Sequence, residues 1–182
     1  MDAELIGRAQ LGDEEAFASL AVAVGDRLHA VSHRILRDTD LAEDATQQAL
    51  LTMWRDLPKL RDPARFDAWS YRLLVRACYA EARRTRHWAP NIRLLPVDEP
   101  VVAEGLGMVV DRDQLERGFR RLSIDHRAVV VLHHYLDLPL DEVADVLGVP
   151  VGTVRSRLHH AMRGLRAALD ADARPTPREV AQ

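Results

Sequence analysis

The sequence is poor in the residues on which several common protein classes depend. Cys78 is the single cysteine among 182 residues, which excludes a disulfide framework and a zinc site built from thiolates. Aromatic residues make up 5% of the chain. No run approaches the ~20 apolar residues of a membrane-spanning helix, and no charged and apolar leader opens the chain. These absences predict a soluble, cytoplasmic protein without membrane insertion.

Motifs of catalysis and metal binding are also absent. The sequence has no glycine-rich phosphate loop, no GxSxG motif and no HExxH motif. Its eight histidines are not grouped with carboxylates at metal-ligand spacing. Carboxylate pairs such as Glu14-Glu15 fall at predicted helix starts, where negative charge favours the helix dipole. We predict a protein that is not an enzyme, with no catalytic residue, metal, cofactor or small-molecule substrate.

Lysine is nearly missing, because Lys59 is the only one among 25 basic residues. The formal net charge is −3, so the chain as a whole is not a polycation that nucleic acid attracts. The arginines are instead concentrated locally, as between residues 61 and 93. This distribution favours binding to nucleic acid through particular faces of the protein.

Helix-forming residues dominate, and β-branched residues do not alternate as they do in strands, which predicts an all-α fold. Two helical blocks, residues 1–87 and 112–170, flank a segment rich in proline and glycine. That segment, 88–111, is predicted to be a flexible linker, and residues 171–182 a frayed tail. Within the first block, Gly25 is predicted to break or kink the helix that begins near residue 13. The sequence therefore predicts two small helical domains.

The last third of the chain reads as a helix, a tight turn and a second helix. Gly148 follows the last apolar position of the first helix, 140–147, and suits a left-handed cap, while Pro150 can start the next helix. On the second helix, 151–169, apolar residues share one arc, and the residues facing away from it are Arg155, Ser156, His159, His160, Arg163 and Arg166. Such a helix fits a DNA major groove. The alternative is a solvated face on a C-terminal core helix.

A second candidate face lies on a long helix predicted to start at Asp62 or Pro63 and to end near Arg86. A basic stripe on it recurs at spacings of seven, four, three and four residues, namely Arg65, Arg72, Arg76, Tyr79 and Arg83. Trp69 borders the stripe. Cations beside aromatic rings are typical of surfaces that bind single-stranded nucleic acid. The alternative is an ordinary solvated arginine face beside a core tryptophan.

A third face lies on the helix predicted between residues 41 and 56. Its core side carries small apolar residues, Ala42, Ala45, Ala49 and Met53. Leu51 and Trp54 fall on the opposite, otherwise polar side, which suggests a docking surface for another protein. The alternative is that a neighbouring helix of the same block covers them.

Both blocks together resemble the extracytoplasmic-function (ECF, group 4) sigma factors of bacterial RNA polymerase, in the sigma-70 family. The segment DLAEDATQQALLTMWR, residues 40–55, is similar to region 2.2 of that family. FDAWSYRLL, residues 66–74, with the arginines that follow, is similar to regions 2.3 and 2.4. Residues 139–169 are similar to region 4.2, and VGTVRSRLH at 151–159 is especially close to the family pattern.

The resemblance implies a transcription initiation factor that binds core RNA polymerase, directs it to −10 and −35 promoter elements and promotes DNA melting. It implies docking on the β′ clamp helices by Glu43, Asp44, Gln47, Gln48, Leu51 and Trp54. It implies −10 contacts by Arg65, Trp69, Tyr71, Arg72, Arg76 and Arg83. It implies −35 contacts by Thr153, Arg155, Ser156, Arg157, His159, His160 and Arg163. It also implies that residues 125–136 lie near the β flap, and that an anti-sigma factor is a partner.

The chain departs from the family pattern at positions that bear on these contacts. Gln48 stands where the family often has glutamate, Arg76 where it often has asparagine, and His160 where a basic residue is usual. The first concerns polymerase docking and the other two concern promoter sequence. From the residues alone, the alternative function is a helix-turn-helix regulator that binds operators without polymerase. A third is an interaction protein whose helix-turn-helix no longer binds DNA.

Overall fold

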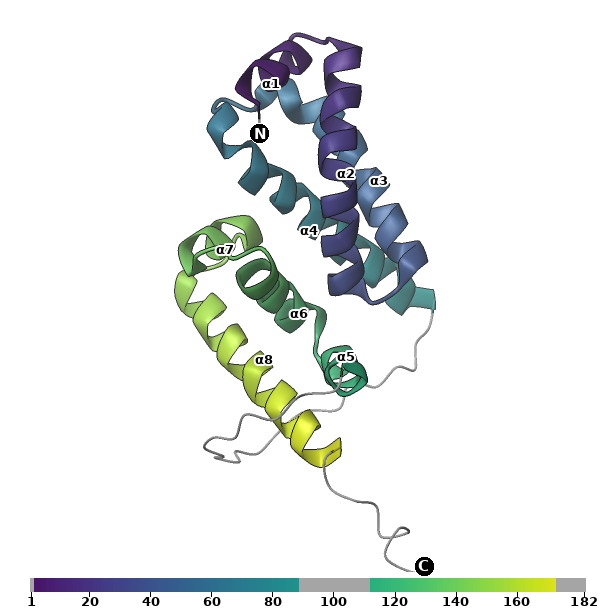
Figure 1. Ribbon diagram of the computed structural model, residues 1–182, viewed down its shortest axis with the longest axis vertical. Coiled ribbons are helices and arrows are strands. Elements are labelled where there is room, and N and C mark those ends of the chain that lie inside the picture. Colours follow the sequence, from purple (N-terminus) through teal and green to yellow (C-terminus); the bar gives the residue numbers. More distant parts are fainter. Residues whose placement is uncertain (1, 89–111, 173–182) are drawn as a thin grey trace, which may run out of the picture.

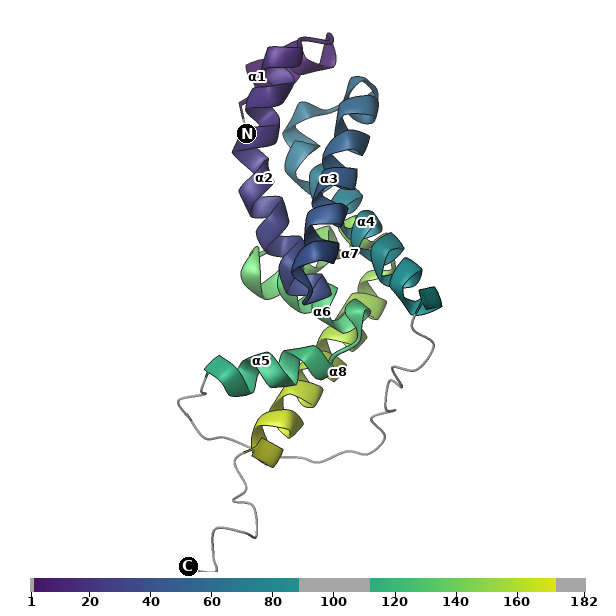
Figure 2. The same ribbon diagram turned by 90° about the vertical axis from the view of Figure 1, so that its right-hand side faces the viewer.

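The computed structural model describes residues 2–88 and 112–172, and every regular element in these two ranges is helical. This confirms the predicted all-α class. Figures 1 and 2 show the helices gathered into two groups that lie against each other along the long axis of the molecule. The predicted linker, 88–111, and tail, 171–182, lie outside the described residues except at their ends.

The first domain contains α1 to α4. Their bounds are α1 Ala3–Gln10, α2 Glu14–Leu36, α3 Thr39–Asp56 and α4 Phe66–Trp88, with 3-10 turns at Leu57–Lys59 and Pro63–Arg65. An aspartate caps the start of each of the first three helices, because the side chains of Asp2, Asp13 and Asp38 accept backbone N–H groups there. Helix α3 packs against both α2 and α4.

The second domain contains α5 to α8. Their bounds are α5 Arg112–Arg121, α6 Ile124–Val130, α7 Leu140–Leu147 and α8 Val151–Asp172. The predicted helix from 125 to 136 is therefore two elements, because α6 continues as a π-helical turn at Val131–Tyr135. Helix α7 has its predicted bounds, and Gly148 ends it with φ 67°, which confirms the left-handed cap. Helices α7 and α8 form the predicted helix-turn-helix.

The prediction that Gly25 breaks or kinks its helix is wrong. Helix α2 runs without interruption from Glu14 to Leu36. Its buried positions continue in helical register on both sides of the glycine, as Leu20, Val24 and Leu28 show. Burial of each such side chain contributes about 1.5–3 kcal/mol, which exceeds the ~1 kcal/mol that one glycine costs a helix.

Replacement of Gly25 by alanine is expected to stabilise the protein by about 0.5–1 kcal/mol, because alanine loses less backbone entropy in a helix. A Cβ at this position would meet no atom within 4 Å. Gly12→Ala serves as the contrasting variant, because Gly12 has φ 90° and a side chain there costs about 1–2 kcal/mol. Urea denaturation followed by circular dichroism measures both changes. Equal effects at the two sites would contradict the explanation.

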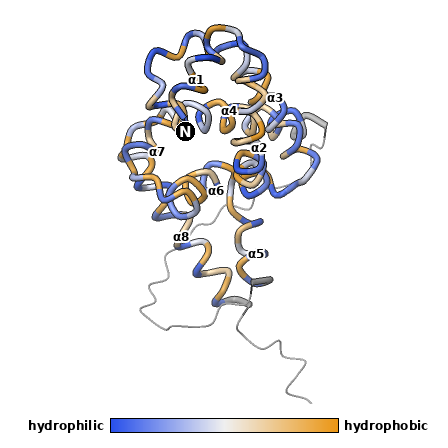
Figure 3. Tube along the Cα trace, turned by 45° about the horizontal axis from the view of Figure 1, so that its top comes forward, coloured by the Kyte–Doolittle hydropathy of each residue, from blue (hydrophilic) through white to orange (hydrophobic). Residues whose placement is uncertain are grey.

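The two domains share one apolar core. Buried residues of α2 and α4 form a single cluster with buried residues of α6, α7 and the π-helical turn. Figure 3 shows hydrophobic and hydrophilic stretches alternating along the helices, as amphipathic packing requires. The predicted core side of α3 is confirmed, since Ala42, Ala45, Ala49 and Met53 are all buried. The domains therefore pack together, which helical periodicity did not indicate.

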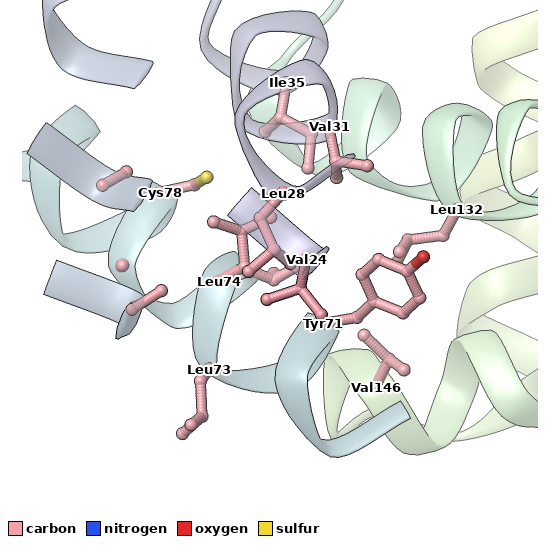
Figure 4. Packing of buried hydrophobic residues seen from close by; sticks show 14 of the residues in the cluster. Val24, Leu28, Val31, Ile35, Tyr71, Leu73, Leu74, Cys78, Leu132 and Val146 are labelled. Carbon is pink, nitrogen blue, oxygen red and sulfur yellow. The ribbon is translucent and has the colours of Figure 1, made fainter. Parts of the chain in front are cut away.

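Cys78 lies in this core on α4 (Figure 4), and burial raises the pKa of its thiol to about 12. Since the thiolate is the reactive form, we expect almost no reaction with a thiol reagent such as DTNB in the folded protein at pH 8. Stoichiometric reaction is expected in 6 M guanidinium, where the unfolded thiol has an ordinary pKa. Rapid labelling under native conditions would show that the core around α4 opens readily.

Candidate nucleic-acid and protein interfaces

The outer face of α8 brings three of the predicted −35 residues together. Arg155, His159 and Arg163 line an open hollow of about 290 Å³. Leu140, Leu158 and Met162 supply its apolar part, and Arg166 joins the cationic part. Arg155, His159, Arg163 and Arg166 follow one another at spacings of four, four and three residues, which keeps them on one side of a helix. This surface can bond phosphate oxygens or the acceptors of guanine.

The remaining predicted −35 residues lie elsewhere on α8. Arg157 is half-buried, with its Nη1 atom 3.5 Å from Oδ1 of Asp125 on α6. The ring of His160 stacks over that of His126 with 6.4 Å between centroids. Burial, and then the neighbouring His160 and Arg157, lower the pKa of His126. Ser156 donates its hydroxyl to the Thr153 carbonyl at 3.0 Å. The predicted set thus divides between two sides of the helix.

The residues predicted to contact the −35 element did not include Arg166. The structure places Arg166 beside Arg155, His159 and Arg163. Its spacing along the helix could have identified it. The position of Arg157, in contrast, depends on α6, which comes close only through the packing of the domain.

The basic stripe on α4 is partly exposed and partly covered. Arg76 and Arg83 are exposed, and Trp69 is half-buried with its ring 6.0 Å from that of Phe66. Tyr71 is only 4% exposed and lies in the core shared by the two domains. Arg65 and Arg72 both contact Asp145 of α7. The stripe therefore exists, with Arg76 and Arg83 exposed and with Arg65, Arg72 and Tyr79 in contact with the second domain.

The polar face of α3 stays on the surface. Glu43, Asp44, Gln47 and Gln48 are exposed, and Asp44 forms an ion pair of 2.9 Å with Arg84 of α4. Leu51 is 65% exposed and Trp54 is 39% exposed, so no neighbouring helix covers Leu51. One side of the Trp54 ring meets Phe17 of α2, with 4.8 Å between centroids. Phe17 thus borders this face, which only the packing of α2 on α3 reveals.

Among the described residues, no group of three or more histidine, cysteine or acidic side chains is placed to hold a metal ion. None of the described helices is both long and apolar enough to cross a membrane. The main features that these helices offer a partner are the three faces on α3, α4 and α8.

Comparison with known proteins finds two family regions, which follow one another in the same order as the two helical domains. The family model of sigma-70 region 2 matches residues 20–87, and that of sigma-70 region 4 matches residues 112–165. The ECF RNA polymerase sigma factor SigM of Mycobacterium tuberculosis is 31% identical over 170 residues, covering 92% of this chain and 84% of SigM. This chain belongs to the ECF sigma factors. SigW of Bacillus subtilis is 26% identical over 179 residues, covering 90% and 94% of the two chains.

Solved structures show the same fold. The sigma factor RpoE of Bartonella quintana, solved in complex with the anti-sigma factor NepR, aligns with a TM-score of 0.66 and 20% identity, covering 86% of this chain and 98% of RpoE. CnrH in complex with the cytosolic domain of CnrY aligns with a TM-score of 0.64 and 24% identity, covering 94% and 99%.

The sigma factor is thus a transcription initiation factor. It binds core RNA polymerase, directs it to promoter DNA and promotes melting, which is the function that the resemblance implied. The operator-binding regulator is correspondingly disfavoured. The first domain contains the match to region 2 and the second domain the match to region 4.

Proposed function

We propose that each of the three faces of this sigma factor binds a different part of polymerase or promoter DNA. The face on α3, made of Glu43, Asp44, Gln47, Gln48, Leu51 and Trp54, docks on the β′ clamp helices of polymerase. The stripe on α4, with Trp69 and Tyr71, binds the melted strand of the −10 element, and the outer face of α8 reads the −35 duplex. The second domain, around 125–136, contacts the β flap.

The observation that carries this proposal is the exposure of Leu51 and Trp54 among acids and amides on α3. Leu51 and Trp54 lie one helical turn apart, and Phe17 borders Trp54, so the three form a contiguous apolar patch, which indicates a surface that a partner covers. The acidic and amide neighbours supply polar contacts around that apolar centre, an arrangement common in protein interfaces. This face lies within the segment that matches sigma-70 region 2.

The charge of the other two faces supports binding to DNA. Arg76 and Arg83 on α4 and Arg155 and Arg166 on α8 are exposed, although the chain as a whole is acidic. Such local cations position a protein on phosphates, while side chains in the groove select the bases. Binding of the free chain to duplex DNA is therefore expected to be weak and sensitive to salt.

Other features of the proposal follow from the family. We place the protein in group 4, with domain boundaries at residues 87 and 112, and locate it in the cytoplasm. It acts by binding and not by covalent chemistry, and it needs no cofactor. Of the two solved structures with this fold, RpoE is bound to the anti-sigma factor NepR and CnrH to the cytosolic domain of CnrY. We propose that an anti-sigma factor is also a partner of this chain.

Co-purification with core RNA polymerase tests the proposal. A tagged chain is mixed with core polymerase, and the complex is isolated by size exclusion. We expect a stoichiometric holoenzyme that forms without DNA and protects both −10 and −35 segments of a promoter. An operator-binding regulator would bind its duplex alone and elute apart from polymerase, and that outcome would contradict the proposal.

A further inference from the structure

Three imidazole rings form a row that crosses from α6 to the outer face of α8. The ring of His126 on α6 stacks on that of His160, with 6.4 Å between centroids and 28° between the ring planes. The ring of His160 meets that of His159 edge to face, with 5.8 Å between centroids. Helices α6 and α8 pack on each other, as Figures 1 and 2 show. The row therefore runs from a partly buried ring to the hollow that His159 lines.

The two outer rings of this row lie on a surface that is already cationic. His159 and His160 are both exposed. The charged side chains that line the hollow together with His159 are Arg155, Arg163 and Arg166, and no acid is among the residues that line it. A protonated imidazole in this hollow would add to the positive charge. The anion that balances it has to come from a ligand, and a DNA phosphate is such an anion.

The inner ring stays neutral and contributes no charge to the row at pH 7. Burial, and then the charges of His160 and Arg157, lower the pKa of His126, while Asp125 opposes them. The Asp125 carboxylate accepts the hydroxyl of Tyr79 from α4 at 2.8 Å and lies 3.5 Å from Nη1 of Arg157. Asp125 is thus engaged by two donors, and His126 offers His160 the face of a neutral ring.

The other helices that pack on α8 meet it mainly through apolar groups. Helix α7 brings Leu140 into the hollow, and Asp141 and Glu142 follow in the first turn of α7, where both are exposed. Helix α5 meets α8 beyond the row, where Gly118 lies against Leu165 and Ala168.

Histidine is the side chain that ordinarily changes its charge between pH 5 and 8. A phosphate beside an imidazole favours the protonated form, and by linkage the proton then favours binding of the phosphate to the same degree. We propose that His159 and His160 take up protons when α8 binds the −35 duplex, so that the affinity of this sigma factor for its promoters increases as the pH falls. This inference rests on the −35 role of α8 proposed above.

The expected effect follows from the number of cations on this face. Arg155 and Arg163 are charged at any pH and hold the duplex under all conditions. Each protonated histidine adds one contact to a phosphate, which we expect to increase affinity about fivefold between pH 8 and pH 6. The two histidines together are expected to give a gain of about 20-fold. The dependence on salt is expected to become steeper, by about 0.9 in the logarithmic slope for each added contact.

The test uses holoenzyme assembled from core polymerase and the full-length chain. The probe is a fluorescent duplex with the −35 segment of a promoter that the holoenzyme selects from a library of promoter fragments. Anisotropy gives the affinity at pH 8 and at pH 6 at one ionic strength. His160→Arg fixes the charge at one position, and the double variant His159→Gln with His160→Gln removes both titrating groups. His134→Gln is the control, because His134 is also exposed but lies on the π-helical turn.

We expect the unaltered chain and His134→Gln to gain about 20-fold in affinity from pH 8 to pH 6. His160→Arg is expected to bind more tightly at pH 8 and to gain only about fivefold, and the double variant is expected to show no gain. A merely structural role would lower the affinity of the double variant equally at both pH values and leave its pH dependence intact. That result, or an unaltered chain without pH dependence, overturns the inference.

Circular dichroism at both pH values shows whether the variants are folded. If the double variant is unfolded, His160→Arg decides the question, because its side chain is exposed and a gain equal to that of the unaltered chain would overturn the inference.

Selection of promoter fragments separates this inference from the proposed function. Fragments selected by the holoenzyme, but bound with the same pH dependence by the unaltered chain and the double variant, would refute proton uptake and leave the −35 role standing. If no fragment is selected in a way that depends on the chain, the proposed function is refuted and this inference with it.

Discussion

Replacement of Leu51 by glutamate is expected to weaken assembly with core RNA polymerase by 100-fold or more. The side chain is exposed in the free protein, so the substitution leaves the fold intact. In the complex, the proposed docking would bury this position, and a carboxylate there would lose its hydration without gaining a partner. A loss of about 2.7 kcal/mol corresponds to a 100-fold change in Kd and lies within the range of interface hot spots.

Fluorescence titration of labelled core polymerase with the sigma factor measures this Kd. Leu11→Glu is the matched control, because Leu11 is 91% exposed and lies outside the α3 face. The control is expected to bind polymerase within twofold of the unaltered chain. Equal losses for the two variants, or no loss for Leu51→Glu, would show that α3 does not carry the docking surface.

Removal of the Arg155 side chain is expected to reduce promoter binding by the holoenzyme about 10- to 100-fold, which corresponds to ~1–3 kcal/mol for a specific contact with a base. Arg155 is exposed at the hollow on α8, together with His159 and Arg166. Arg157, two residues away, is half-buried beside Asp125. The Arg157→Ala variant is therefore expected to lose less than fivefold in promoter binding.

Titration of the holoenzyme against duplexes with every substitution in the −35 element measures both variants. Arg155→Ala is expected to relax the preference at one or two adjacent base pairs, whereas loss of a phosphate contact would weaken all duplexes alike. A larger effect for Arg157→Ala than for Arg155→Ala would contradict the geometry of α8 in this structure.

Local signals in the sequence were sufficient to predict much of the fold. Helix α7 has its predicted bounds because Gly148 and Pro150 mark the turn that follows it. The core side of α3 was predicted correctly because Ala42, Ala45, Ala49 and Met53 repeat with the period of a helix. The predicted break at Gly25 was wrong because glycine disfavours a helix by only ~1 kcal/mol. Burial of the apolar face that continues past Gly25 outweighs this cost.

Contacts between distant segments could not be predicted in this way. Arg65 and Asp145 are separated by 80 positions in the chain, and no periodicity within α4 or α7 indicates that they meet. For the same reason, the sequence did not predict that Tyr71 is buried or that Arg157 lies beside Asp125. The sequence showed which residue types share a helical face, and the structure shows which of those faces another helix covers.

Transcription in vitro shows whether this chain starts transcription at promoters as a sigma factor. The purified chain is combined with core polymerase on a library of promoter fragments, and the start sites that depend on the chain are sequenced. We expect discrete starts preceded by shared −10 and −35 elements. DNA binding by the chain alone, without any start that depends on it, would contradict the account and favour an operator-binding regulator.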